Sequence, residues 1–468
     1  DPTTGALVGV GGEHRSLTPL GRAVGFSSGA LVTSCAFGRF SDGTYLLTDG
    51  TSNGVSGHVL YWAEGSPEAG FSNPLKINSM TTLDATASGL KDTTGASFGG
   101  ANAGVQCAWI TESDVVFFVA RGTAADARVS LFRCKRNTAA SGNDTVGSDA
   151  NFSNKQAVLD LGRWSGAWDS AGIRTFNQHA FLEATVNGAK HLYLAEYNVL
   201  SGRTSGSGGA GKDQAVVWRS TDGGATWAVF LEYNTGGTHF FDHFHGVLQD
   251  PYTGWIYFLT GDSGNENAVI GYNGTAGTLA ANATLATIGS TAGYCVGYGN
   301  ELWRYCGLIF TPTNIVGLPD CDTETAEAGT VGYSCTIMDK RLQMVGRTAA
   351  LQRRDNVPPS LAVSAADGSW HAYVSFRTHV SPTDPSPYLD VWTSNDASGA
   401  YGWTLAAQVR NYRAMTGVPR QVYIDGDYLR IAGTYGGGIQ FSSAVQTGTM
   451  VSLKIAGRAG GPLIFDGT

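Results

Sequence analysis

The sequence has no long hydrophobic run and no excess of positive charge. None of its apolar stretches approaches the roughly 20 residues that a membrane-spanning helix needs, so we expect no membrane insertion. The formal net charge of the 468-residue chain is -8. Because binding to a phosphate backbone requires a basic surface, we also expect no nucleic-acid partner.

The chain is poor in charged residues, which make up 15% of it, and it has no convincing helical periodicity. In their place it has 65 glycines and 11% aromatic residues. This composition is typical of many short strands joined by tight turns. The sequence therefore predicts an all-β protein.

One unit returns along the chain: an apolar strand, a tight polar turn, and a second apolar strand that ends in a polar residue. The turns begin near residues 41, 112, 187, 250, 312, 366 and 425. A period of roughly 65 residues fits four-stranded blades with loops. We predict a single seven-bladed β-propeller of four-stranded antiparallel blades over residues 30–468, with residues 1–29 as a lead-in segment that closes the ring. A six-bladed ring with an insertion near residues 295–345 is the alternative.

Residues 220–227 carry the pattern Ser-x-Asp-x-Gly-x-Thr-Trp between two apolar runs. Asp222 can accept hydrogen bonds from the amides of its own turn, and Trp227 can pack under the hairpin. A degraded copy begins at Ser394 and ends at Trp403. The pattern resembles the Asp-box of the sialidase-like (BNR-repeat) β-propellers, in which it joins the third and fourth strands of a blade. The resemblance implies a propeller of the kind found in secreted bacterial carbohydrate-active enzymes and in phage tail proteins.

Ionisable groups occupy equivalent positions in most copies of the repeat. The start of a first strand and the end of a second strand meet on the same face of such a ring. We predict that these groups line a funnel, with catalytic roles for His179, His245, Tyr197, Glu196 and Asp262. The predicted substrate-binding residues are Arg121, Arg377, Arg420, Asp49 and Tyr435. Guanidinium groups match a carboxylate bidentately, so we expect an acidic polysaccharide or glycan as the partner.

Two chemistries fit this set of residues. A glycoside hydrolase would use two carboxylates, such as Glu196 and Asp262, with the pKa of one of them raised. A uronate-type polysaccharide lyase would use His179, His245 or Tyr197 to abstract a proton beside the sugar carboxylate. The alternative without chemistry is a glycan- or receptor-binding propeller, such as a phage tail tip protein. We expect the protein to be extracellular or on a virion surface.

A metal and disulfides are two further expectations. His243 and His245 would share one face of a strand and could hold a divalent metal, although the same imidazoles could be an acid–base pair or packed rings. No other cofactor is implied. Among the seven cysteines, the spacings of Cys295 with Cys306 and of Cys321 with Cys335 favour two local disulfides. Buried thiols that act as small hydrophobic side chains are the alternative.

Overall fold

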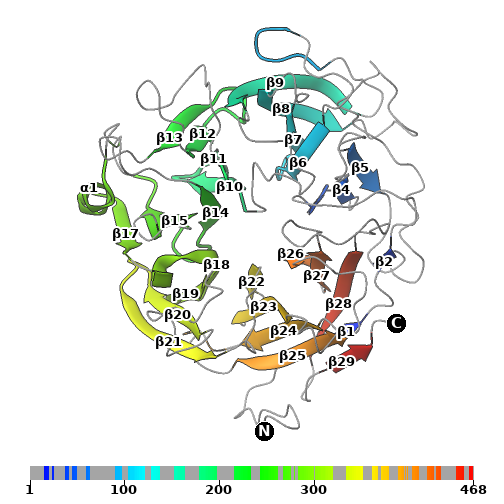
Figure 1. The fold of residues 1–468 in the computed structure, drawn as a ribbon, viewed down its shortest axis with the longest axis vertical. Coiled ribbons are helices and arrows are strands. Elements are labelled where there is room, and N and C mark those ends of the chain that lie inside the picture. The colour runs from blue at the N-terminus through cyan, green and yellow to red at the C-terminus, as the bar shows by residue number, and fades with distance from the viewer. Residues whose placement is uncertain are drawn as a thin grey trace.

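The chain is described by a computed structural model in the parts that form its strands and their turns. These are residues 15–19, 24–25, 37–41, 45–49, 59–63, 90–96, 104–121, 128–136, 152–163, 179–197, 215–232, 243–261, 267–275, 279, 283–299, 301–319, 334–350, 361–366, 370–378, 388–394, 396, 398, 403–410, 419–425, 428–433, 449–457 and 463–466. Within them the strands form seven sheets, which are arranged in a ring (Figure 1). We number the sheets in chain order.

The first three sheets hold the strands up to residue 231. Sheet one contains β3 (Phe37–Arg39), β4 (Tyr45–Asp49) and β5 (Val59–Ala63). Sheet two contains β6 (Gly104–Ile110), β7 (Val115–Arg121), β8 (Arg128–Arg136) and β9 (Phe152–Arg163). Sheet three contains β10 (Phe181–Val186), β11 (Ala189–Ala195), β12 (Val217–Ser220) and β13 (Ala228–Leu231).

Sheets four and five follow with four strands each. Sheet four contains β14 (Phe244–Gln249), β15 (Ile256–Thr260), β16 (Ala268–Tyr272) and β17 (Tyr294–Tyr298). Sheet five contains β18 (Tyr305–Phe310), β19 (Asn314–Pro319), β20 (Ser334–Asp339) and β21 (Met344–Ala350). The described helices are short: α1 (Leu285–Ser290) and the 3-10 turn η1 (Glu301–Trp303).

The last two sheets recruit strands from the chain ends. Sheet six contains β22 (Leu361–Ala366), β23 (Trp370–Thr378), β24 (Tyr388–Ser394), β25 (Thr404–Arg410) and β29 (Leu463–Asp466). Sheet seven contains β26 (Pro419–Asp425), β27 (Tyr428–Gly433), β28 (Thr449–Gly457), β1 (Arg15–Pro19) and β2 (Val24–Gly25). Strands β1 and β2 both pair antiparallel with β28, and β29 pairs parallel with β25.

The architecture confirms the prediction of an all-β propeller with almost no helix. Each of the seven predicted hairpins is the first antiparallel pair of a different sheet, from β3–β4 to β26–β27. The six-bladed alternative placed an insertion near residues 295–345, and the strands β18, β19 and β20 within this range belong to sheet five. Sheet one has three strands among the described residues, so the number of complete blades stays a prediction. The domain boundary at residue 29 also stays a prediction.

Aromatic side chains fill the space between neighbouring sheets. Phe117 of sheet two meets Trp227 of sheet three edge to face, with ring centroids 6.0 Å apart. Tyr193 of sheet three and Phe258 of sheet four make a similar contact at 5.9 Å. Sheets four and five are joined by Tyr257 and Phe310 at 5.5 Å. Such pairs bury large apolar areas, so this packing is the main attraction that holds one sheet on the next.

The turn between β12 and β13 has the hydrogen bonds that the sequence predicts. Asp222 Oδ1 accepts the amides of Ala225 and Thr226 at 3.0 Å each, and Oδ2 accepts the Thr226 hydroxyl at 2.6 Å. These bonds, led by the Thr226 hydroxyl, lower the pKa of the Asp222 carboxyl to about 2. Gly224 has φ +84°, and a Cβ there would lie 2.2 Å from Phe117 Cζ. The turn therefore requires glycine both for its backbone conformation and for its approach to sheet two.

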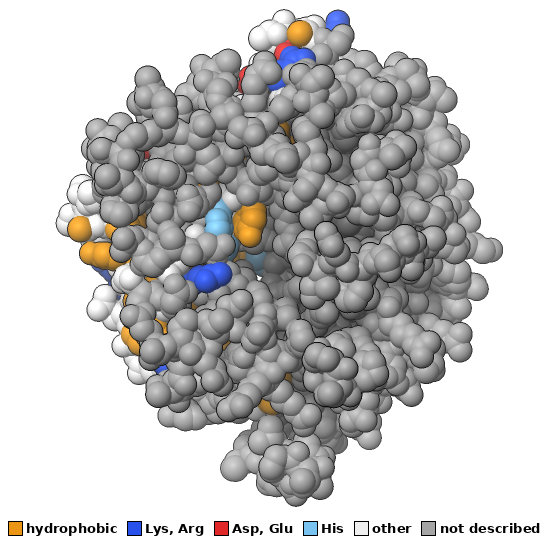
Figure 2. All heavy atoms as spheres, in the orientation of Figure 1, with side chains coloured by type: hydrophobic (Ala, Val, Ile, Leu, Met, Phe, Trp, Pro, Cys, Tyr) orange, Lys and Arg blue, Asp and Glu red, His pale blue; other side chains and the backbone are white. Residues whose placement is uncertain are grey.

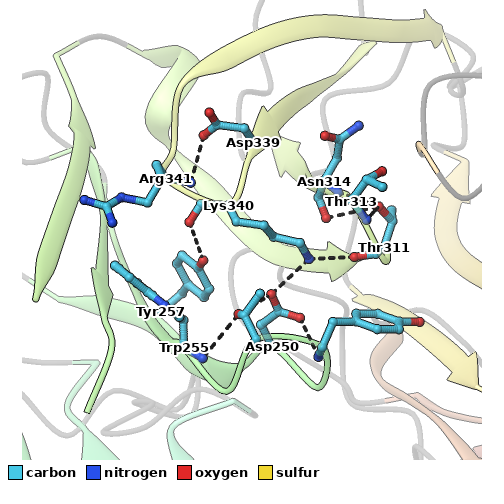
Figure 3. A network of polar contacts seen from close by, with 11 residues as sticks. Asp250, Trp255, Tyr257, Thr311, Thr313, Asn314, Asp339, Lys340 and Arg341 are labelled. Atoms are coloured by element: carbon cyan, nitrogen blue, oxygen red, sulfur yellow. Dashed lines mark hydrogen bonds and ion pairs between the residues drawn. The ribbon is translucent and has the colours of Figure 1, made fainter. Parts of the chain in front are cut away.

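A buried ion pair ties sheet four to sheet five (Figure 3). The Lys340 ammonium group lies 2.9 Å from Asp250 Oδ2 and donates a 2.6 Å hydrogen bond to the carbonyl oxygen of Thr311. Asp250 is fully buried and also accepts the Tyr252 amide at 2.9 Å and the Thr253 hydroxyl at 2.7 Å. Burial lowers the pKa of Lys340, and the bond to Asp250 opposes that shift. The carboxylate is thus stable only while Lys340 stays in place.

The two predicted disulfides are not formed. Cys295 is a free, buried thiol, and Cys134 and Cys335 are buried and form no disulfide. Burial raises the pKa of the Cys295 thiol to about 12, so this thiol is unreactive at neutral pH. The partners named for the two bridges, Cys306 and Cys321, have side chains outside the described residues. The described cysteines are instead buried and pack as small apolar groups, which was the alternative to the disulfides.

Within the described residues, no helix has the length and apolar character needed to cross a bilayer.

We expect Asp222→Ala to lower the free energy of unfolding by about 1–2 kcal/mol, because two turn amides and the hydroxyls of Ser220 and Thr226 lose their acceptor. The turn is exposed, which keeps the loss in the lower part of the usual range. Chemical denaturation measures it. Asp222→Asn keeps one carbonyl oxygen for the amides and should lose less. Equal losses for the two variants would contradict the role given to the amides.

We expect Lys340→Met to destabilise the protein by about 3 kcal/mol, because it leaves the carboxylate of Asp250 buried without its cation. The matched control is Lys190→Met, which breaks a pair with Glu112 whose side chains are 46% and 72% exposed. The control should cost less than about 1 kcal/mol. Denaturation midpoints of the two variants compare them directly. Similar shifts would show that the ion pair does not hold sheet five to sheet four.

Candidate functional site

Sheets three and four are joined through their backbones at the inner end of the ring. The amide of Phe244 donates to the carbonyl oxygen of Glu196 at 2.9 Å, and the amide of Val247 donates to that of His179 at 2.7 Å. His179 also forms an isolated parallel bridge with Gly246. A Cβ on Gly246 would lie 2.6 Å from His179 Cβ, so glycine permits this approach. The start of β14 and the end of β11 are therefore fixed relative to each other.

Two imidazoles meet at this junction. The Nε2 atoms of His243 and His245 lie 3.1 Å apart, and His245 Nδ1 lies 2.7 Å from the carbonyl oxygen of Tyr305. Both rings are buried, at 9% and 2% exposure. The sequence predicted that these two side chains share a face, and the structure brings their rings into direct contact.

Tyr197 covers the imidazole pair. Its ring centroid lies 4.7 Å from that of His243 and 6.3 Å from that of His245. Tyr197 is partly exposed, in contrast to the two buried histidines. A phenol on the solvent side of two imidazoles is an arrangement that can donate and accept protons within a small volume.

The backbone of His179 lies beside this cluster, against β14. Its side chain keeps some exposed surface, but protein surrounds the imidazole, and the resulting loss of hydration lowers the pKa of His179 to about 4. No hydrogen-bond partner for its ring occurs among the described residues. His179 is therefore a neutral imidazole at neutral pH, able to accept a proton or to donate one N–H to a ligand.

The side chain of Glu196 is buried inside sheet three and is not accessible to solvent. Its carboxylate is fully buried and accepts the Trp218 indole N–H at 2.7 Å and the Val216 amide at 3.1 Å. Both donors belong to the third strand of the same sheet or its entry. Both carboxylate oxygens of Glu196 are therefore used by donors within sheet three. Glu196 therefore supports sheet three, and the catalytic role that the sequence predicts for it stays a prediction.

Four other predicted residues lie at strand ends, where only their backbones are described. Asp49 and Arg121 are the last residues of β4 and β7, and Arg377 is the last but one of β23. Arg420 is the second residue of β26. The predicted residues Asp262 and Tyr435 lie outside the described residues.

A β-bulge recurs at the start of the innermost strand, a feature that the sequence did not reveal. The register shifts between Val105 and Cys107 in β6, and between Phe244 and Gly246 in β14. The same shift occurs between Tyr305 and Gly307 in β18, and between Pro419 and Gln421 in β26. A bulge leaves one residue out of the ladder and turns its side chain. The skipped residues are Gln106, His245, Cys306 and Arg420.

The face drawn in Figure 2 is hollowed near its centre. Histidine side chains lie at the edge of this hollow, over β10 and β14, together with a side chain of the hydrophobic class and a basic side chain. The histidines whose side chains are described are His179, His191, His243 and His245. The hollow is therefore lined in part by groups that can exchange protons.

The described residues do not supply a complete metal site. No group of three or more His, Cys, Asp or Glu side chains that could hold a metal ion occurs among them. His243 and His245 provide two nitrogens, whereas a stable site needs a third and usually a fourth ligand. The hydrogen-bonded contact between the two rings agrees better with an acid–base pair.

No family model matches the chain, and no curated protein matches it. Similar solved structures include a putative oxidoreductase (glucose dehydrogenase) of Thermus thermophilus, at 12% identity and a TM-score of 0.39, covering 94% of this chain and 99% of that one. They also include Trypanosoma rangeli sialidase in complex with sialic acid, at 12% identity and a TM-score of 0.38, covering 96% of this chain and 58% of that one. An α-L-arabinofuranosidase of Podospora anserina in complex with cellotriose has 11% identity and a TM-score of 0.29, covering 60% of this chain and 91% of that one. Likeness at this level does not assign an activity.

The low pKa of His179 predicts how stability depends on pH. The unfolded chain binds a proton on this group below about pH 6.5, whereas the folded protein does so only below about pH 4. Stability should therefore fall as the pH drops from 6.5 towards 4. His179→Asn should flatten the curve of unfolding free energy against pH in this window. Tyr197→Phe, which keeps His179, should retain the slope. An unchanged slope in His179→Asn would contradict the prediction.

Proposed function

We propose that the protein is a carbohydrate-active enzyme, and more specifically a polysaccharide lyase that cleaves a uronate-containing polysaccharide at the inner end of sheets three and four. The observation that carries this proposal is the contact of Tyr197 with the hydrogen-bonded pair of His243 and His245. These groups can move protons but provide no carboxylate nucleophile.

The position of Glu196 favours a lyase over a hydrolase. A glycoside hydrolase of the usual kind needs two carboxyl groups that face the glycosidic bond from opposite sides. Glu196, the first of the two predicted carboxylates, has its oxygens occupied by Trp218 and Val216 inside sheet three. Histidine and tyrosine chemistry remains, and β-elimination requires only a proton acceptor and a proton donor.

The elimination proceeds as follows in this proposal. An imidazole of the cluster removes the proton from the sugar carbon that bears the carboxylate, a double bond forms between this carbon and its neighbour, and the bond to the glycosidic oxygen breaks. The Tyr197 hydroxyl donates a proton to the leaving oxygen. At the end of the reaction the imidazole has gained one proton and the phenol has lost one. Transfer of one proton from the imidazole to the phenolate, directly or through solvent, restores both groups.

Pairing of the substrate carboxylate makes the proton easier to remove. Negative charge flows towards the carboxylate in the transition state, and guanidinium groups stabilise it there. Arg121, Arg377 and Arg420 lie at strand ends equivalent to the ends that carry Tyr197 and His245. We propose that these arginines bind the acidic sugar. An enzyme of this kind acts where such polymers occur, outside the cell or on a virion surface.

We expect the purified protein to convert at least one uronate polysaccharide into products with the ultraviolet absorbance of an unsaturated sugar. Tyr197→Phe and His245→Gln should lower kcat by about 100-fold or more, since each removes a proton-transfer group. The matched control is Tyr298→Phe, which changes an exposed tyrosine at the corresponding end of the outermost strand of sheet four and should keep full activity.

Mass spectrometry of the products distinguishes the alternatives. A hydrolase adds one water to each cleaved bond, whereas a lyase does not. Binding of the polysaccharide without any product would support the glycan-binding alternative and overturn the lyase proposal. Full activity of both Tyr197→Phe and His245→Gln would place the chemistry elsewhere on the ring.

A further inference from the structure

His245 is enclosed by three neighbours that act on different sides of its ring. The carbonyl oxygen of Tyr305, from sheet five, lies 2.7 Å from Nδ1. His243 Nε2 lies 3.1 Å from Nε2. The third neighbour is Gly261, which follows β15, and a Cβ there would lie 2.5 Å from Cε1 of the imidazole and 3.0 Å from Nε2.

The carbonyl contact determines which ring nitrogen carries hydrogen. A carbonyl oxygen only accepts hydrogen bonds, so Nδ1 of His245 must be the donor at 2.7 Å. In the neutral imidazole, Nε2 then holds a lone pair. His243 must donate its own Nε2–H to that lone pair across 3.1 Å. The direction of both hydrogen bonds follows from a single backbone oxygen.

We propose that Gly261 and the backbone carbonyl of Tyr305 are positioning elements that hold His245 as the Nδ1–H tautomer, with its Nε2 lone pair directed at His243. The consequence for chemistry rests on the proposed function. The two rings then act as one unit that takes up a single proton, because a second proton would set two N–H groups against each other at 3.1 Å.

The bulges in β14 and β18 explain how this contact arises between two sheets. The register shifts just before Gly246 in β14 and just before Gly307 in β18. The shift removes His245 from the regular alternation of the strand and turns its side chain, while β14 and β18 lie against each other. Gly261 leaves the space that the turned ring fills. The backbone of Gly261 has no left-handed conformation that would oppose an alanine, so the contact with the imidazole is what opposes it.

The test uses the full-length protein labelled with 15N in histidine, because 15N chemical shifts distinguish the two tautomers of a neutral imidazole. His245→Gln assigns the signals by their loss. We expect the Nδ1–H tautomer for His245 in the wild type. Gly261→Ala should give a mixture of tautomers, and it should lower kcat by about 100-fold with little change in KM, since a displaced group loses its alignment. Gly346→Ala is the matched control, because a Cβ there would first meet Ile337 Cδ1, at an ordinary 3.9 Å.

His243→Gln separates the influence of the two partners of His245 without adding bulk. The glutamine amide can still donate to Nε2, so the Nδ1–H tautomer should persist if the carbonyl of Tyr305 sets it. An Nε2–H tautomer in the wild type, or a change of tautomer in His243→Gln, would overturn the proposal. So would unchanged spectra and kcat in Gly261→Ala. The spectra need no substrate, so failure of the lyase proposal would appear separately, as absence of product with the tautomer intact.

Discussion

Two backbone hydrogen bonds at the centre of the ring, from Phe244 to Glu196 and from Val247 to His179, determine where the candidate site lies. They set the inner strand of sheet four against the end of the second strand of sheet three. Tyr197 and His245 come from these two sheets and can meet only if the sheets keep this register. The apolar packing between the sheets supplies the attraction, but it has little direction of its own. Backbone hydrogen bonds supply the direction.

The two fully buried carboxylates of this region both serve the framework. Glu196 holds the indole of Trp218 near the inner end of sheet three, and Asp250 holds Lys340 at the opposite end of sheet four. The sequence predicted Glu196 and Asp262 as a catalytic pair; Glu196 is buried, and Asp262 lies outside the described residues. A carboxylate inside the protein is retained only where donors surround it. Partners on neighbouring strands or sheets, which sequence spacing does not reveal, provide those donors.

Local chemistry explains why the sequence predicted the fold well. The seven hairpins depend on turns such as Asn187-Gly188, where both residues have positive φ, and these turns are readable from neighbouring residues. The bonds of Asp222 are local for the same reason. The bulge at His245, the free thiol of Cys295 and the parallel pairing of β29 depend on distant segments, and no local pattern indicated them. In the candidate site, the sequence indicated that His243 and His245 act together. The contact between His245 and the backbone carbonyl of Tyr305 could not be predicted, because every residue type has that carbonyl.

The composition of sheet seven has a consequence for synthesis on the ribosome. Its strands β1 and β2 are made long before their partner β28, which lies at residues 449–457. Sheets two to five can pair as they appear, because each is made of consecutive strands. The first strands, in contrast, have open edges until residues 449–457 are made, and open edges invite pairing with other chains. Slow translation, or a message truncated before β28, should therefore yield a nascent chain whose need for chaperones is greatest around β1 and β2.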